Sequence, residues 1–257
     1  MPTIPCPNAD CGEQVDDWLT HCTECGHFVG FPNKRRASVM RSALEAHFTA
    51  AQNAAVVRGA QAPLKALETC LNNAVATINV SPQILAIMVL NQPYLSYHRA
   101  LDRQLRQKAE DEYHAHRTSV DATIHPGYEK EIIYAALNPN GAGLTTYGSV
   151  TIQLKQSVLD RRASLLRENA FFFFERYRLG EHDRKEEQGW RAEWADRAKL
   201  GVAHLAESLT EATTASDLAK LVLTVGETRA DDRLIEVHIH GQIRACRQLS
   251  QMTLATQ

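Results

Sequence analysis

The sequence predicts an α+β protein: a small metal-binding module, a helical segment and then a larger body that mixes strands with helices. Three observations lead to this prediction. Four cysteines lie within the first 25 residues, apolar residues recur at helical spacing from residue 38 onward, and short strand-like runs bounded by turn residues follow later in the chain. A length of 257 residues allows one large domain, or a small one beside a medium one.

The composition is that of an ordinary globular protein, with 44% hydrophobic residues, 23% charged residues and a formal net charge of −2. This balance argues against a protein dominated by a basic nucleic-acid-binding surface. No apolar run approaches the roughly 20 residues that span a bilayer, and the N-terminus lacks the basic start and apolar stretch of a signal peptide. We therefore expect no membrane association and a cytoplasmic location.

The cysteines are unevenly distributed. Two short loops, CPNADC and CTEC, contain Cys6, Cys11, Cys22 and Cys25. In a reducing compartment such a cluster favours a metal site over disulfides, and thiolates at this spacing favour tetrahedral Zn²⁺ with no open position. The segment resembles a zinc ribbon over residues 1–31, and a module this small needs its structural Zn²⁺ in order to fold. Cys70 and Cys246 are interpreted as ordinary buried thiols.

Residues 32–91 are expected to be a linker followed by a helical scaffold. The basic triplet within residues 32–36 is interpreted as a solvated hinge, with a contact to phosphate as the alternative. Helical periodicity covers residues 38–59 and 62–78, and a Ser-Pro pair marks the start of a third helix over residues 81–91.

The rest of the chain contains the predicted strands, five or six in total. A short strand is expected at residues 94–98, and residues 100–117 have the mixed charges of a solvated helix or a mobile loop. Two apolar runs, 132–137 and 150–154, flank the turn-rich NPNGAG and predict strand, loop and strand. Four consecutive phenylalanines, residues 171–174, cannot all be exposed, so their element is expected to be buried on several sides.

The last predicted strand, residues 234–243, alternates apolar and polar residues. Glu236, His238 and His240 therefore point to one face, as in a half-buried strand. These side chains have three interpretations: polar residues that merely face water, ligands of a metal ion, or a catalytic carboxylate with histidine neighbours. Further histidines that could complete a metal site are His114, His116 and His125.

Two segments carry a resemblance to a known family. The sequence YGSVTIQLKQSVLDRRAS at residues 147–164 and the strand IEVHIHG at residues 235–241 resemble ADP-ribosyltransferase-like domains of bacterial toxins. The resemblance covers about residues 92–250. It implies that residues 92–257 form a mixed, split-sheet α+β domain that uses NAD⁺ as a substrate.

The resemblance also implies roles for single residues. Transfer of ADP-ribose passes through an oxocarbenium-like state at the nicotinamide ribose, and Glu236 would stabilise that positive charge. Tyr147 or Ser164 would take the place of the family's hydroxyl-bearing residue near the nicotinamide.

The residues expected to bind NAD⁺ lie on two strands. The family's first motif is a strand with Arg or His that holds the dinucleotide, and here the segment offers His98 and Arg99, next to Tyr97. His238 is expected to line the same cleft. Leu234 stands where many family members have a second Glu or Gln, which makes transfer to arginine less favoured.

The resulting prediction is an NAD-dependent ADP-ribosyltransferase, of the kind found in toxins, toxin–antitoxin systems or anti-phage defence. Its zinc ribbon would recognise a macromolecular target or partner, which the sequence leaves open as protein, RNA or DNA. An inhibitor or antitoxin protein is a further expected partner. The alternatives are a metal-dependent enzyme built on the Glu236 face and a non-catalytic zinc-ribbon binding module.

Overall fold

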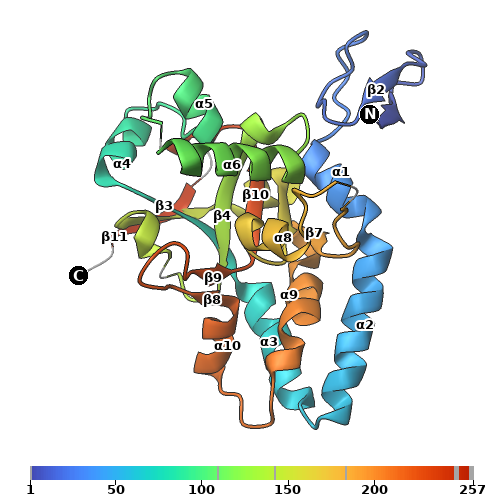
Figure 1. Cartoon of the computed structure of the whole chain (residues 1–257), viewed down its shortest axis with the longest axis vertical. Helices are drawn as coiled ribbons and strands as arrows, with labels where there is room; N and C mark the ends of the chain where they lie inside the picture. The colour runs from blue at the N-terminus through green and yellow to red at the C-terminus, as the bar shows by residue number, and fades with distance from the viewer. Residues whose placement is uncertain (1, 109, 142, 183, 246–248, 255–257) are drawn as a thin grey trace.

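The computed structural model describes residues 2–108, 110–141, 143–182, 184–245 and 249–254. Within these ranges, seven strands form one sheet, here called the main sheet, in which every neighbouring pair is antiparallel (Figure 1). In their spatial order the strands are β11 (Leu249–Leu254), β5 (Val150–Leu154), β3 (Val75–Val80), β4 (Ile132–Asn138), β10 (Glu236–His240), β6 (Ala163–Leu166) and β7 (Arg191–Glu193).

The remaining elements are helices and two small two-stranded sheets. The α-helices are α1 (Pro32–Val39), α2 (Arg41–Val57), α3 (Gln61–Asn73), α4 (Pro82–Val89), α5 (Tyr97–Asp102), α6 (Asp111–Ile124), α7 (Gln156–Arg162), α8 (Ala170–Arg176), α9 (Arg197–Leu205) and α10 (Ala215–Val222). Short 3₁₀ turns are η1 (Glu129–Glu131), η2 (Thr145–Tyr147), η3 (Trp194–Asp196) and η4 (Ala206–Ser208). The small sheets pair β1 (Thr3–Pro5) with β2 (Gln14–Asp16), and β8 (Leu223–Thr224) with β9 (Arg233–Leu234).

The α+β class is confirmed, but the arrangement of the sheet differs from the split, mixed sheet that the resemblance implies. The reason is β3, which pairs with β4 on one side and with β5 on the other. It thereby joins strands from both halves of the body into one continuous antiparallel sheet.

The position of β3 also corrects the expected helical scaffold. The helix predicted over residues 62–78 ends at Asn73 as α3, and the following VATINV is a strand. Its alternation places Ala76 and Ile78 in the main core and leaves Thr77 on the opposite face. Valine, threonine and isoleucine suit a pleated strand better than a helix, because branching at Cβ restricts their side chains in helices.

The main sheet has one apolar face. On β10 this face is formed by Val237 and Ile239, both completely buried. The same core cluster contains Leu44 of α2, Leu67 of α3 and Leu200 of α9. The hydrophobic core of the body therefore lies between this face and helices α2, α3 and α9, which Figure 1 draws below and to the right of the sheet.

The opposite face of the main sheet, which we call the polar face, contains Glu236, His238 and His240. The alternation predicted for this strand is confirmed, but all of β10 is buried rather than half-buried. The cause is α6, which crosses over β4 and β10 (Figure 1). Asp121 of α6 accepts a 2.6 Å hydrogen bond from the hydroxyl of Tyr134 on β4.

The segment expected to be a solvated hinge is helix α1, and the hinge prediction is wrong. Proline at the first helical position favours a helix start because its φ is already fixed near the helical value. Asn33 is 2% exposed, and its amide donates hydrogen bonds to the backbone oxygen of Arg162, to the Ser164 hydroxyl and to the backbone oxygen of His238. Arg36 forms an ion pair with Glu186. Helix α1 is therefore built into the body.

The N-terminal module has its own small core, made of Cys6, Val15, Cys22 and Val29. Arg35 of α1 attaches the module to the body. Its guanidinium donates four hydrogen bonds of 2.5–2.9 Å to backbone oxygens of the module, at Asp17, Leu19, Val29 and Gly30. The predicted buried thiol of Cys70 is half-buried, and Cys246 lies outside the described residues.

Candidate functional site

The four cysteines of the N-terminal module lie together, with all their sulfur atoms within 4.8 Å of one another. The Sγ atoms of Cys6 and Cys25 are 3.6 Å apart, and those of Cys11 and Cys22 are 3.7 Å apart. A tetrahedron with zinc–sulfur bonds of about 2.3 Å has edges of about 3.8 Å. The cluster can therefore hold a metal ion, as predicted from the spacing of the cysteines.

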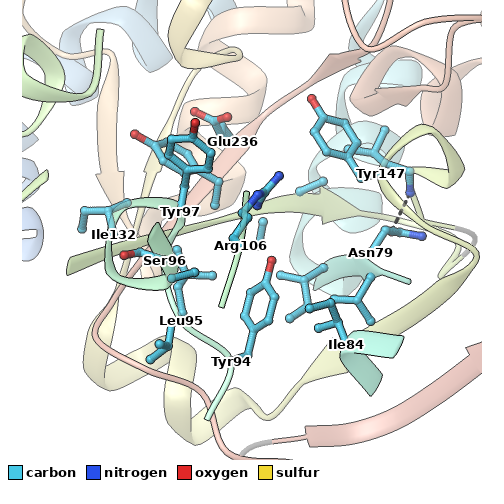
Figure 2. Close-up of a pocket in the computed structure, with 18 of the residues that line it drawn as sticks. Asn79, Ile84, Tyr94, Leu95, Ser96, Tyr97, Arg106, Ile132, Tyr147 and Glu236 are labelled. Carbon is cyan, nitrogen blue, oxygen red and sulfur yellow. Dashed lines mark hydrogen bonds between the residues drawn. The ribbon is translucent and has the colours of Figure 1, made fainter. Parts of the chain in front are cut away.

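A pocket of about 420 Å³ opens on the polar face of the main sheet (Figure 2). Its floor is formed by β3, β4 and the start of β10, and its walls come from α4, α5, α6 and α8. In this view Tyr97 lies on the left and Tyr147 on the right, with the guanidinium of Arg106 between them and Tyr94 below it. The pocket therefore combines a buried strand, several aromatic rings and a cationic side chain.

Glu236 is the first residue of β10 and lines the pocket, although only 6% of it is exposed. Its Oε2 atom accepts the backbone N–H of Ala170, at 3.0 Å, and lies 2.9 Å from Nε2 of His238. Within the described part of the chain, Oε1 has no hydrogen-bond partner. One carboxylate oxygen is therefore held by the protein, and the other is left for a ligand.

The second carboxylate of the pocket, Asp121, is already engaged. It is 1% exposed, accepts a hydrogen bond from Tyr134, and lies 2.9 Å from Nε2 of His98 and 3.3 Å from Nε of Arg117. Burial, followed by the charge of Asp121, raises the pKa of Tyr134 well above its ordinary value. Asp121 thus organises the wall of the pocket, whereas Glu236 is the carboxylate that can act on a ligand.

Tyr147 and Tyr97 both line the pocket. Burial, followed by the nearby charges of Glu236 and Asp232, raises the pKa of Tyr147 to about 12. Its hydroxyl therefore stays protonated and can donate a hydrogen bond at any physiological pH. The hydroxyl of Tyr97 is 2.9 Å from Nδ1 of His114.

Two arginines give the pocket a positive charge that the sequence did not reveal. Arg106 lies 4.9 Å from the ring centre of Tyr97, and Arg229 lies 4.6 Å from the ring centre of Tyr147. Of the residues in the described ranges, none forms an ion pair with either guanidinium. Both side chains are exposed and line the pocket, so they can contact an anionic ligand.

His98 and Arg99 do not occupy the position expected for them. The strand predicted at residues 94–98 is a single bridge at Tyr94, and Ser96 then caps helix α5 by accepting the N–H of Arg99. His98 turns toward Asp121, and Arg99 pairs with Glu131. Neither side chain lines the pocket. Ser96, two residues before His98 and three before Arg99, starts a helix here, because its hydroxyl satisfies a free N–H of the first turn.

Ser164 and His238 also lie outside the pocket. Ser164 is 2% exposed and accepts a hydrogen bond from Asn33, so the structure gives it a role in attaching α1. His238 has no exposed surface and lies behind Glu236. Of the predicted functional residues in the body, the structure therefore brings Glu236, Tyr147 and Tyr97 together.

For the alternative of a second metal site on the polar face, the described residues provide no ligand set. The ring of His240 packs on Phe31, His114 contacts Tyr97, and His116 packs on Phe171. Only His125, of the histidines considered, comes close to His238. Throughout the described ranges, the four cysteines are the only group of three or more His, Cys, Asp or Glu residues placed to hold a metal ion.

No protein-family model matches the chain, and no curated protein matches it. In the part of the chain that the structure describes, every helix is too short or too polar to cross a membrane.

Proposed function

We propose that the protein is an NAD-dependent ADP-ribosyltransferase whose site is the pocket on the polar face. The observation that carries the proposal is Glu236: a buried carboxylate with one free oxygen, at the floor of a pocket of about 420 Å³ lined by aromatic residues. The resemblance of residues 147–164 and 235–241 to ADP-ribosyltransferase-like toxin domains points to the same glutamate.

The chemistry requires a carboxylate of this kind. The glycosidic bond between the ribose C1′ and the nicotinamide nitrogen breaks, and its electron pair leaves with neutral nicotinamide. Positive charge develops on the ribose, and Oε1 of Glu236 stabilises it through the ribose hydroxyls and by its charge. A nucleophilic atom of the acceptor then bonds to C1′ and loses its proton. Water as acceptor would give hydrolysis instead of transfer.

The other pocket residues suit a dinucleotide. Arg106 and Arg229 can neutralise a diphosphate, and guanidinium groups bind phosphate oxygens through paired hydrogen bonds. Tyr97 and Phe171 contribute aromatic surface to the lining of the pocket. Tyr147 offers a protonated hydroxyl near Glu236.

We further propose that the four-cysteine module is a zinc ribbon with a structural Zn²⁺, and that it recognises a protein. Residues 1–31 contain five acidic residues and no lysine or arginine, and four thiolates around one divalent ion would add two further negative charges. Phosphate backbones are repelled by such a surface, so RNA and DNA are unfavourable partners for the ribbon. A basic protein target, or an inhibitor protein in a toxin or anti-phage system, fits this charge.

The proposed function is tested by nicotinamide release from NAD⁺ in the presence of total cell protein or total RNA. We expect release by the wild type and a loss of about 10²- to 10³-fold in rate for Glu236→Gln, because the amide keeps the shape but not the charge. If the NAD⁺ carries a label in its ADP-ribose part, the fraction that becomes labelled, protein or RNA, identifies the class of acceptor.

Glu175→Gln is the matched control. Glu175 is an exposed glutamate of α8, outside the pocket, so its amide variant should react at the wild-type rate. Equal rates for wild type and Glu236→Gln, or no release with any acceptor, would contradict the proposal. A non-catalytic binding module would show neither release nor affinity for NAD⁺.

A further inference from the structure

The chemistry proposed above gives no role to His238, the residue that lies behind Glu236. His238 has no exposed surface and does not line the pocket, yet its Nε2 atom lies 2.9 Å from Oε2 of Glu236. A histidine that only packs in a core does not need a carboxylate at hydrogen-bond distance.

The direction of this hydrogen bond follows from the second partner of Oε2. The backbone N–H of Ala170 can only donate, so Oε2 accepts at 3.0 Å, and the proposed reaction uses Glu236 as a carboxylate. An ionised carboxylate only accepts, and Nε2 of His238 must therefore carry the proton. The charge of the ring therefore depends on whether Nδ1 also carries a proton.

The surroundings of Nδ1 favour the neutral ring. Nδ1 is buried and has no hydrogen-bond partner in the described ranges. The rings that face His238 are His125, at 4.5 Å between centres, and Tyr134, at 5.1 Å, both edge-on. His125 is itself neutral, because burial lowers its pKa well below the ordinary value. A proton on Nδ1 would add a buried charge and an unpaired donor, which is more costly than a bare nitrogen.

The ring is also held in place. The backbone oxygen of His238 accepts a 3.1 Å hydrogen bond from the buried amide of Asn33, which fixes β10 against α1. His125 and Tyr134 confine the ring. The donor at Nε2 therefore has one fixed position relative to Glu236.

We propose that His238 is a positioning residue for Glu236: as the neutral Nε2–H tautomer, it donates to Oε2 and, together with the N–H of Ala170, holds the carboxylate with Oε1 toward the pocket. This replaces the expectation that His238 binds the dinucleotide. The direction of the hydrogen bond and its catalytic consequence both rest on the proposed function, whereas the 2.9 Å contact between Nε2 and Oε2 does not.

The hydrogen bond is tested without any substrate. We expect the ¹⁵N-histidine NMR spectrum of the full chain, loaded with Zn²⁺, to show His238 with a proton on Nε2 and none on Nδ1. The signal is assigned by its absence from His238→Gln. A protonated Nδ1, as the other tautomer or as imidazolium, would overturn the proposal.

The positioning role is tested by two substitutions and a control. His238→Leu removes the donor, and we expect kcat for nicotinamide release to fall by about 10- to 100-fold while the Kd for NAD⁺ changes by less than about 3-fold. His238→Gln keeps an N–H donor at the corresponding reach and should recover most of kcat. His240→Leu alters a buried histidine of the same strand that packs on Phe31 and lies outside the pocket, so its kcat should stay within about 3-fold of wild type.

The outcomes separate this inference from the proposed function. If His238→Leu weakens NAD⁺ binding more than it lowers kcat, His238 contacts the dinucleotide and the positioning role is wrong. Equal losses in the Leu and Gln variants would mean that only packing matters and would also overturn it. A wild type that binds no NAD⁺ and releases no nicotinamide overturns the proposed function, and the NMR spectrum then still decides whether His238 holds Glu236.

Discussion

At the scale of single residues, the two buried carboxylates on the polar face of the main sheet differ in their hydrogen-bond partners. Asp121 has Tyr134, His98 and Arg117 around it, and its carboxylate is fully engaged. Among the residues that the structure describes, Glu236 has donors on one oxygen only. Two buried acids on neighbouring elements thus have different roles, and the difference lies in their hydrogen-bond partners.

His240 makes the stability of the protein depend on pH. Burial lowers its pKa to about 4, from an ordinary value of 6.5, so the folded state favours the neutral ring. The opposing charge of Glu131 raises the pKa, and Arg162 and Arg35 lower it further. Since the unfolded chain takes up the proton first, the stabilisation is present above pH 6.5 and is lost as the pH falls toward 4.

We therefore expect urea unfolding to show that the wild type loses more stability than His240→Gln between pH 7 and pH 4. Lowering the pKa from 6.5 to about 4 corresponds to a difference on the order of 3 kcal/mol. Comparing the two proteins cancels the other histidines and the cysteines, which titrate in both. Free energies of unfolding that fall in parallel would show that His240 is not held neutral.

At the scale of secondary-structure elements, helix α1 connects the N-terminal module to the candidate site. Arg35 binds four backbone oxygens of the module, and Asn33 binds the backbone oxygens of Arg162, at the end of α7, and of His238 in β10. Phe31, at the start of the helix, packs on His240 at 5.2 Å between ring centres.

Removing the guanidinium of Arg35 should loosen the module selectively. We expect Arg35→Ala to speed hydrogen exchange of the amides in β1 and β2 while exchange in the main sheet stays unchanged, with a loss of about 2 kcal/mol in stability. Arg41→Ala is the control, because Arg41 is 56% exposed in its side chain and its ion pairs with Glu193 and Asp196 contribute little. Uniformly faster exchange across the chain would contradict this account of α1.

Some of the secondary-structure elements could be predicted from the sequence, and others could not. The alternation of β10 and the apolar runs of β4 and β5 identified three strands of the main sheet, because each strand packs one apolar face on the core. The strand β3 was missed because it follows α3 without a glycine or proline. Helix α1 was missed because its basic residues resemble a solvated segment. In the fold, Arg35 binds backbone oxygens of the module, and Lys34 and Arg36 pair with acids more than 100 residues away in the sequence.

The candidate site was predictable to the extent that local pattern or resemblance marked its residues. Glu236 stood out on an alternating strand, and Tyr147 belonged to a recognisable segment. Asp121 and Arg117 had only a weak signal, a charged pair four residues apart on a helix. Arg106 and Arg229 come from connecting segments with no periodicity, and only the folded chain brings them to the pocket.

At the scale of the whole molecule, the N-terminal module and the body have separate cores. The module's core contains two of the four cysteines, whereas the main core contains none of them. The module projects from the end of α1 at one corner of the body (Figure 1). Metal in the module is therefore expected to control the folding of the module rather than that of the main sheet.

We expect the purified chain to contain one Zn²⁺, measured by atomic emission. Chelation or Cys22→Ser should unfold residues 1–31, because thiolate ligation supplies the folding free energy of such small modules. The main sheet should persist, as followed by circular dichroism and hydrogen exchange. Cys70→Ser is the matched control and should leave the metal content unchanged. Metal retained by Cys22→Ser at the full amount would contradict the assignment of the ligands.

The central claim is that the pocket on the polar face binds NAD⁺ with Glu236 at the reacting ribose. The most direct measurement is calorimetric titration of NAD⁺ into Glu236→Gln, in which slow turnover allows binding to be measured alone, beside the double variant that also carries Arg106→Ala. We predict a complex with one NAD⁺ per chain for Glu236→Gln, and binding about 10-fold weaker in the double variant, because one guanidinium contact to phosphate is lost. The absence of any binding to Glu236→Gln and to the wild type would contradict the account.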